Sequence, residues 1–263
     1  MKYVFLILFL AHSAAKAQNP GPRLTAMGSG GTAISDIWAL QQNPAGIAEL
    51  KAPIIAVAYE KHFLDADVST QNAVFVLPFR RNVLGASLER YGFSEFNEQK
   101  VGVYYARRFG DSFSMAIGFR YYQLNITQYG SAEAFTLDVG FQLKVTNEFT
   151  IASHIANPNQ SRYNNLQGSN LPAKLSLGGS FKVSDRLLMS ADLMKLLKYP
   201  PDFMTGIEYN IIQWMSLRGG VSVNPLKQYT GFGIRHRKIQ FDVSVASHPN
   251  LGYSPQVALA YEF

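Results

Sequence analysis

The sequence predicts an all-β fold, a transmembrane β-barrel of about 14 antiparallel strands with a short N-terminal helical hatch in or under its lumen. Three observations lead to this prediction. Only 16% of the 263 residues are charged, whereas soluble chains have roughly 25%. Apolar and polar residues alternate along most of the chain after residue 53. The chain also begins with the pattern of an export signal.

Residues 1–17 have the features of a cleavable signal peptide. Lys2 precedes an apolar run over residues 3–11, and Ala15-Lys16-Ala17 forms a small-residue cleavage site. The apolar run is too short to cross a bilayer as a helix, so we expect cleavage after Ala17. The chain has no Cys, which excludes disulfides and a Cys-linked lipid anchor in the exported protein.

Residues 18–52 are predicted to form a hatch segment before the barrel at 53–263. Within "WALQQNPAGIAEL" (38–50), Asn43 is suited to cap a short helix and Pro44 to occupy its first turn. The preceding "SDIWALQQ" (35–42) can form another short helix. Two short helices ahead of a barrel predict a plug inside the lumen, with Trp38 and Ile47 against the inner wall.

The strands are predicted from alternation with a period of two residues. In "FTLDVGFQLKV" (135–145), for example, the odd-numbered side chains are all apolar and most of the even-numbered ones are polar. Most predicted strands have the length that a tilted strand needs to cross a bilayer. The predicted strands are 54–61, 70–79, 83–91, 99–108, 113–123, 133–145, 149–156, 173–183, 186–196, 203–211, 215–223, 229–236, 239–247 and 255–263.

The predicted connections alternate between short and longer segments, which is typical of outer-membrane barrels. An even number of strands places both termini on the short-turn, periplasmic side. The basic runs at 79–82 and 235–238 then fall in short turns. They form no larger cluster, so we do not expect nucleic-acid binding. A soluble β-sandwich is the alternative, but it needs more surface charge than this chain has.

The C-terminal strand resembles the assembly signal of outer-membrane barrels. Leu259, Tyr261 and the terminal Phe263 share one face of "VALAYEF". We therefore expect localisation in a bacterial outer membrane, with membrane lipid around the barrel.

The lumen is predicted to hold a balanced set of charges. Glu208, Arg218, Arg235, Asp242 and Glu262 come from consecutive strands on the polar face, and such groups can pair across strands. The structural interpretation is a filled, ion-paired interior, and the alternative is a polar conduit. The other charges assigned to the lumen are Glu60, Glu89, Arg108, Arg120, Asp138, Lys144, Lys174, Lys182 and Asp192. Glycines within the strands suggest close approach by a plug.

The sequence does not predict an enzyme, a metal site or a cofactor. Ser153 and His154 are neighbours in one strand, so their side chains point to opposite faces. His62 and His248 lie near loop ends without a recognisable catalytic motif. The His, Asp and Glu residues also lack the clustered spacing of metal ligands.

The segment 23–50 resembles the N-terminal region of the long-chain fatty-acid transporter (FadL-like) superfamily, and among these the PorV/PorQ-like members of Bacteroidota-type Gram-negative bacteria. The resemblance rests on an Arg, a Met-Gly pair, an acidic position and an Asn-Pro-Ala-Gly motif. In this chain these are Arg23, Met27, Gly28, Asp36, Asn43, Pro44, Ala45 and Gly46. It implies a fourteen-stranded barrel with an N-terminal hatch.

The resemblance leaves two functions open. PorV-like barrels are partners of the type IX secretion machinery, which implies an accessory subunit with a protein partner in an outer-membrane complex. The alternative is a hatch-gated transporter of small hydrophobic molecules such as fatty acids. The longest predicted loop, 157–172, is polar and lacks the apolar capture site of fatty-acid transporters. We therefore favour the accessory subunit at this stage.

Overall fold

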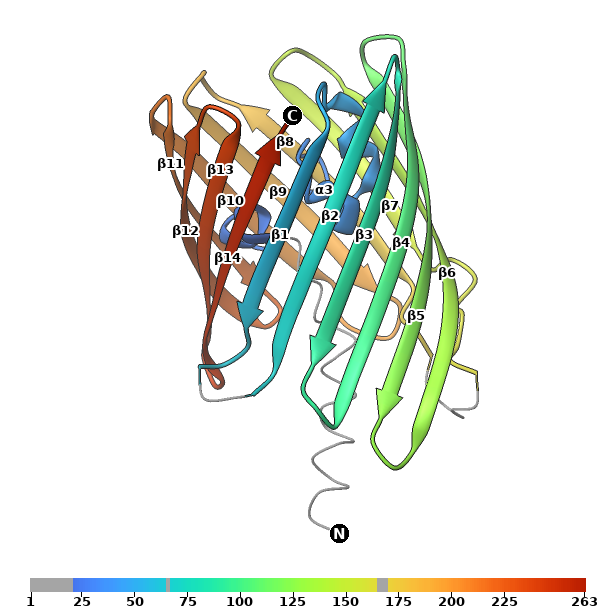
Figure 1. Cartoon of the computed structure of the whole chain (residues 1–263). Helices are drawn as coiled ribbons and strands as arrows, with labels where there is room; N and C mark the ends of the chain where they lie inside the picture. The colour runs from blue at the N-terminus through green and yellow to red at the C-terminus, as the bar shows by residue number, and fades with distance from the viewer. Residues whose placement is uncertain (1–20, 65–66, 165–169) are drawn as a thin grey trace.

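The chain folds into a closed antiparallel barrel that encloses its own N-terminal segment, which confirms the predicted fold class (Figure 1). The computed structural model describes residues 21–64, 67–164 and 170–263. The predicted signal peptide 1–17 and the first residues of the predicted hatch segment lie outside this part. Within it, no helix is both long and apolar enough to cross a membrane.

Each strand pairs with its neighbours in sequence, and β1 pairs with β14 to close the barrel, with Ile54 opposite Glu262. Because the closed sheet has no free edge, every strand can satisfy its backbone groups within the membrane. The strands are β1 (Ile54–Lys61), β2 (Ser69–Phe79), β3 (Asn82–Gly92), β4 (Phe96–Phe109), β5 (Phe113–Ile126), β6 (Gly130–Lys144), β7 (Phe149–Ala156), β8 (Lys174–Lys182), β9 (Leu187–Leu196), β10 (Asp202–Ile212), β11 (Met215–Val223), β12 (Leu226–His236), β13 (Ile239–His248) and β14 (Gly252–Glu262).

The two ends of the barrel differ. The turns after the even-numbered strands β2, β4, β6, β8, β10 and β12 are short, and the C-terminus lies at the same end. The connection between β7 and β8 at the opposite end is the longest. β1 also begins at the short-turn end. The chain therefore leaves the hatch and finishes β14 at the same end of the barrel.

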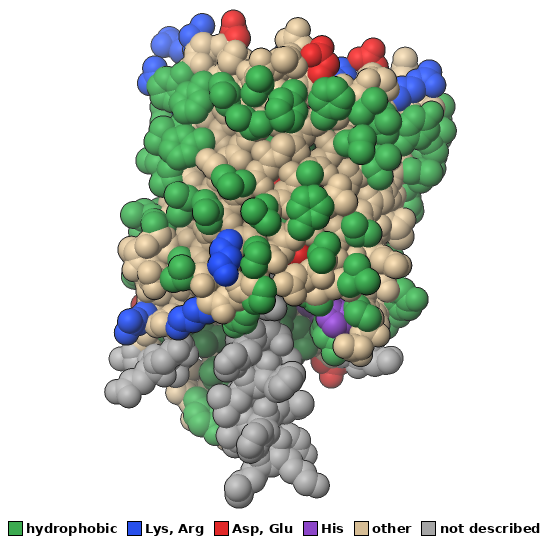
Figure 2. Space-filling model, turned by 180° about the vertical axis from the view of Figure 1, so that it is seen from behind, with side chains coloured by type: hydrophobic (Ala, Val, Ile, Leu, Met, Phe, Trp, Pro, Cys, Tyr) green, Lys and Arg blue, Asp and Glu red, His purple; other side chains and the backbone are tan. Residues whose placement is uncertain are grey.

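The outer surface of the barrel is apolar. Residues that alternate along each strand expose large hydrophobic side chains, such as Val57, Leu88, Val103 and Leu137. Figure 2, which shows the back of the barrel, has hydrophobic side chains spread over the wall and charged side chains mostly near the ends. A lipid bilayer is the solvent in which such a surface is stable.

The inner face carries small and polar side chains and surrounds the hatch. The hatch contains α2 (Gly21–Ala26), α3 (Ala39–Gln42) and the 3-10 helix η1 (Pro44–Glu49). It is drawn in blue inside the barrel in Figure 1. Nearly all of its residues from Gly21 to Ala48 are buried. The lumen is therefore occupied rather than open at the level of the hatch.

The candidate functional site is the hatch and its contacts with the barrel wall

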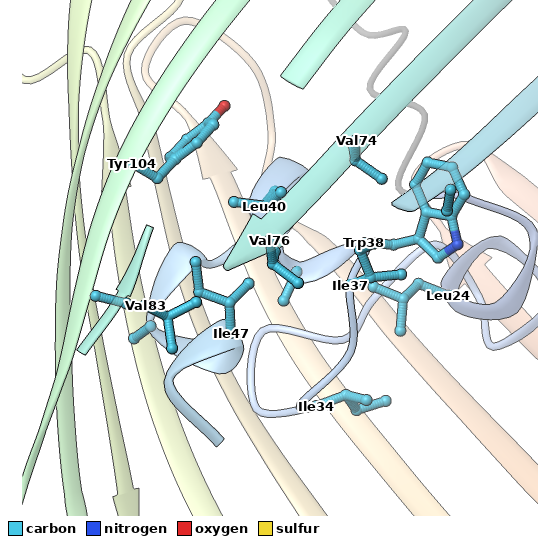
Figure 3. Packing of buried hydrophobic residues seen from close by; sticks show 14 of the residues in the cluster. Leu24, Ile34, Ile37, Trp38, Leu40, Ile47, Val74, Val76, Val83 and Tyr104 are labelled. Carbon is cyan, nitrogen blue, oxygen red and sulfur yellow. The ribbon is translucent and has the colours of Figure 1, made fainter. Parts of the chain in front are cut away.

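One side of the hatch is apolar and packs on the wall formed by β1 to β5 (Figure 3). Trp38, Leu40 and Ile47 are at most 1% exposed. They belong to one hydrophobic cluster with wall residues that are themselves apolar, and small in several cases. These wall residues are Ala56, Ala58, Val74, Val76, Val83, Tyr104, Ala106, Ala116 and Ala258. Without the hatch, this part of the inner wall would be an apolar surface facing the lumen.

Glycines allow the hatch to approach the wall, as the sequence suggested. A Cβ atom on Gly85 would lie 2.4 Å from Leu40 Cδ2 and 3.2 Å from Ile47 Cδ1. On the opposite wall, a Cβ on Gly206 would lie 2.3 Å from the carbonyl oxygen of Met27. Trp38 lies in the same cluster as the wall residues, and its ring also packs on Gly21 of the hatch itself.

The other side of the hatch is held by charges. The guanidinium of Arg23 donates from Nε and Nη2 to both carboxylate oxygens of Glu208, at 2.8 and 2.7 Å, and from Nη1 to Asp36 at 2.6 Å. Glu208 also accepts from Arg218, which donates in turn to Asp242 at 2.5 Å. The resulting ionic chain, Asp36–Arg23–Glu208–Arg218–Asp242, connects the hatch to β10, β11 and β13.

Electrostatics favours this arrangement even though the hatch is out of bulk water. Burial by itself lowers the pKa of the Arg23 guanidinium, but the charges of Glu208 and Asp36 outweigh it and hold that pKa well above its ordinary value. Bidentate guanidinium–carboxylate contacts of this kind are strong and directional. Arg23 therefore stays charged and fixes the position of α2.

The predicted charge network needs a correction. Arg218 joins Glu208 and Asp242 as the sequence suggested, but Arg235 is connected to Asp242 only through Gln240, whose amide donates to Asp242 at 2.6 Å, and Glu262 lies apart from them. Arg235 and Glu262 are both exposed at the short-turn rim, where Arg235 donates to Gln240 at 2.6 Å. They share the inward parity of their strands but lie too close to the strand ends to reach the buried layer. Their places in the chain of charges are taken by Arg23 and Asp36.

Two further contacts fix the hatch. The Asp192 carboxylate accepts from the backbone N–H groups of Gly31 and Thr32, both at 2.9 Å. At the end of η1, Glu49 accepts from Lys144 and lies 3.8 Å from Arg108. The hatch is thus tied to the wall near both of its ends and at its middle.

In the Asn-Pro-Ala-Gly motif, Asn43 joins α3 to η1 and the other three residues form the first half of η1. Asn43 caps η1 by accepting from the N–H of Ala45 at 3.1 Å, and it donates to the carbonyl groups of Thr32 and Phe141. Pro44 occupies the first turn of η1. A Cβ on Gly46 would lie 2.7 Å from the carbonyl oxygen of Ile34. The motif therefore packs the hatch against itself and against β6.

The Met-Gly pair lies against the opposite wall. Gly28 has φ +82°, a conformation that favours glycine. A Cβ on Gly220 would lie 2.2 Å from the backbone nitrogen of Gly28. Met27 is fully buried, so this pair seats the turn after α2 on β10 and β11.

A buried polar group lies on the wall beside the hatch. Arg120 Nη2 is 2.6 Å from Asp138 Oδ2 and donates to the carbonyl of Leu40 at 3.3 Å. His154 Nε2 is 3.6 Å from the same Asp138 oxygen, while Ser153 points to the opposite face. This geometry gives no nucleophile–base pair. No group of three or more possible metal ligands occurs in residues 21–64, 67–164 and 170–263.

The residues of the proposed assembly signal lie on the outside of β14. Leu259, Tyr261 and Phe263 are all exposed, with the rings of Tyr261 and Phe263 5.0 Å apart. The N–H of Phe263 donates to the carbonyl of Pro53 at 3.0 Å. The last residue thus contacts the chain next to β1 at the strand pair that closes the barrel.

A polar cavity of about 750 Å³ opens at the short-turn end, beside the ionic chain. We call it the vestibule. Its lining includes Arg23, Glu208, Arg218 and Asp242, and also Arg235 and Gln240 nearer the rim. The ionic chain therefore forms the floor of a chamber that faces one side of the membrane.

Comparisons with known proteins show which solved structures share this architecture. No protein-family model matches the sequence, and a search of curated proteins finds no match. Solved structures match over almost their whole lengths. The CymD monoaromatic hydrocarbon channel has a TM-score of 0.69 at 13% identity, covering 92% of this chain and 97% of its own. The fold is that of the FadL-type hydrocarbon channels.

Two other matches agree. The toluene transporter TbuX of Ralstonia pickettii has a TM-score of 0.67 at 16% identity, and a FadL homologue of Pseudomonas aeruginosa has 0.66 at 11%. Each alignment covers 92% of this chain and 98% of the other. CymD is described as a channel and TbuX as a transporter. At these identities the likeness concerns the fold alone.

Sequence reasoning missed several residues that hold the hatch. It assigned Asp192 to the lumen without connecting it to Gly31 and Thr32, and it did not single out Glu49 or Gln41, whose amide donates to Asn72 at 2.9 Å. Arg23 and Asp36 were identified from the resemblance only. An arginine and an aspartate in an otherwise uncharged, apolar segment are a signal for a buried ion pair, and this signal was available in the sequence.

Proposed function

We propose that the protein is an outer-membrane transporter of small hydrophobic molecules, in which residues 21–50 form the hatch that closes the lumen. The observation that carries this proposal is the two-sided attachment of the hatch. It covers an apolar inner wall on β14 and β1 to β5 and is tied by charged side chains to β9 and β10, with one further tie from Glu49 to β4 and β6. A hatch that tilts about its ionic side exposes an apolar path along the other side.

The fold supports the same conclusion. The structures that align over nearly their whole lengths are described as a monoaromatic hydrocarbon channel and a toluene transporter. Orientation follows from the barrel: we propose that the short-turn end and both termini of the mature chain face the periplasm. The secretion-accessory function that the sequence favoured has no structural observation in its favour, and the PorV/PorQ assignment remains a prediction.

A disulfide that pins the apolar side of the hatch tests the proposal. A Cβ on Gly85 would lie 3.2 Å from Ile47 Cδ1, so Ile47→Cys with Gly85→Cys places two cysteines near each other in a chain that has no cysteine of its own. Cells that lack other hydrocarbon channels would express the variant, and uptake of toluene and of a long-chain fatty acid would be measured. We expect uptake above the empty-vector level for the wild type, loss when the disulfide is oxidised, and recovery after reduction.

The controls separate transport from assembly. The reduced double variant is the baseline for the oxidised one, because a Cβ at Gly85 already displaces Leu40, and the single variant Ile47→Cys should transport like the wild type under oxidising conditions. Uptake by the wild type no greater than in the empty-vector cells would contradict the transporter. Equal uptake by the oxidised and reduced double variant would contradict the tilting hatch. Recovery of a stoichiometric large protein partner from native outer membranes, without any uptake, would favour the accessory subunit.

A further inference from the structure

Exposed basic residues gather on one half of the short-turn rim. They lie on consecutive strands of the closed barrel, from the β12–β13 turn past β14 and β1 to the end of β4. We call this surface the basic crescent, and it consists of Lys51, Arg80, Arg81, Arg107, Arg235, Arg237 and Lys238. Glu262 is an exposed acidic residue within it.

The other half of the same rim carries exposed charges of both signs, among them the basic Arg186 in the β8–β9 turn. The three turns β4–β5, β6–β7 and β8–β9 each carry an exposed acidic residue, namely Asp111, Glu148 and Asp185. Lys182 in this half is already paired with Asp185 at 2.8 Å. The excess of positive charge at this end therefore belongs to one half of the circumference.

Two turns of the crescent have a backbone conformation that bears on its test. Arg80 and Arg237 occupy the tight turns of the crescent with φ +59° and +51°. A positive φ favours glycine or asparagine, and side chains such as arginine adopt it at a cost. In the β4–β5 turn on the other half, glycine does occupy such a position, Gly110 with φ +63°. The chain also has positive φ at Phe63, Gln128 and Gln160 outside the crescent, so this conformation gives two test positions for substitution by asparagine.

From these observations we infer that the basic crescent is a docking surface for an acidic, extended segment of a partner protein on the short-turn side of the membrane. Lipid headgroups surround a barrel on all sides, so a contact with anionic lipid calls for basic residues around the whole circumference. A crescent on one half fits a partner that approaches from one direction.

The dimensions fit a short peptide. The crescent crosses seven neighbouring strands, which at roughly 4.8 Å per strand is an arc of about 30 Å. An extended chain covers this length with about nine residues at roughly 3.3 Å each. Arg235 belongs both to the crescent and to the lining of the vestibule, so the end of such a segment can enter that cavity.

The test uses a labelled nine-residue peptide of alternating Glu and Ser, and a matched Lys and Ser peptide. The full mature protein would be held in nanodiscs of zwitterionic lipid, and binding followed by fluorescence anisotropy. We expect binding of the acidic peptide only, weakening as salt is raised because exposed charges are screened. The double variant Arg80→Asn with Arg237→Asn should bind it at least tenfold more weakly.

The same variant separates docking from folding. Asparagine tolerates the positive φ at both turns, so its stability should equal or exceed that of the wild type. The control Arg90→Asn with Lys198→Asn removes two exposed basic residues at the long-loop end and should bind like the wild type. Unchanged binding in the crescent variant, or an equal loss in the control, overturns the proposal. If the crescent variant binds the peptide unchanged but no longer enriches phosphatidylglycerol in mixed-lipid nanodiscs, the docking proposal is overturned in favour of a lipid contact.

Discussion

Arg23 of the hatch binds Glu208 of β10 through two parallel hydrogen bonds of 2.8 and 2.7 Å, across 185 positions of the chain. This contact connects a helix inside the lumen to the wall that surrounds it. The third guanidinium nitrogen of Arg23, Nη1, donates to Asp36, so a single guanidinium holds both the wall and the loop after α2.

Replacing Arg23 should therefore destabilise the protein. Arg23→Met leaves Glu208 and Asp36 without a shared cation in a mostly buried site, where breaking such a pair costs about 2–4 kcal/mol. Arg235→Met is the matched control, because Arg235 is exposed and makes one bond to Gln240, and its loss should cost less than about 1 kcal/mol. Urea unfolding in detergent, followed by heat-modifiable gel mobility, measures both. Equal effects would contradict the ionic chain as the anchor.

Neighbouring glycines on β11 give a test of hatch seating. Gly220→Ala places a methyl group 2.2 Å from the backbone nitrogen of Gly28, so the hatch must move, at a cost of about 1–3 kcal/mol. A Cβ added at Gly219 would point outward, and the nearest heavy atom would lie 3.9 Å from it. We expect raised planar-bilayer conductance for Gly220→Ala and none for Gly219→Ala. Silence in both would show that displacing the hatch opens no conduit.

The C-terminal residue is predicted to affect assembly. Deleting Phe263 removes its ring contact with Tyr261 and its hydrogen bond to Pro53. The amount of heat-modifiable protein in outer membranes should fall, while Phe263→Tyr, which retains both contacts, should assemble normally. If the deleted chain reaches wild-type levels, this residue is not part of an assembly signal.

The surroundings of His62, just after β1, predict that the stability of the protein depends on pH. Burial, together with the positive charge of Lys227, lowers the pKa of His62 to about 4. In the unfolded chain its pKa is about 6.5, so the unfolded state binds a proton that the folded state does not. Stability is therefore complete above about pH 6.5 and falls between about pH 6.5 and 4, by up to about 3 kcal/mol. The His62→Gln variant should lack this part of the slope, and identical slopes in both proteins would refute the assignment.

The strands were predictable because the membrane imposes the period of two on each of them. The larger differences from the predicted bounds lie at the long-loop end. For example, β4 begins at Phe96 rather than 99, β5 ends at Ile126 rather than 123, and β12 begins at Leu226 rather than 229. The strands continue beyond the lipid there, where neither face has to be apolar and the alternation fades.

The sequence by itself determined the barrel, the inward parity of each charge and the helix cap at Asn43, because these depend on local periodicity and on neighbouring residues. The tertiary structure decided which charges meet. Parity assigns Arg218 and Arg235 to the same face, but only depth along the barrel separates the buried Arg218 from the exposed Arg235. The tertiary structure also brings Arg23 next to Glu208 and Asp192 next to Gly31. These partners are far apart in sequence and meet only because the closed sheet surrounds the hatch, a constraint that no local pattern contains.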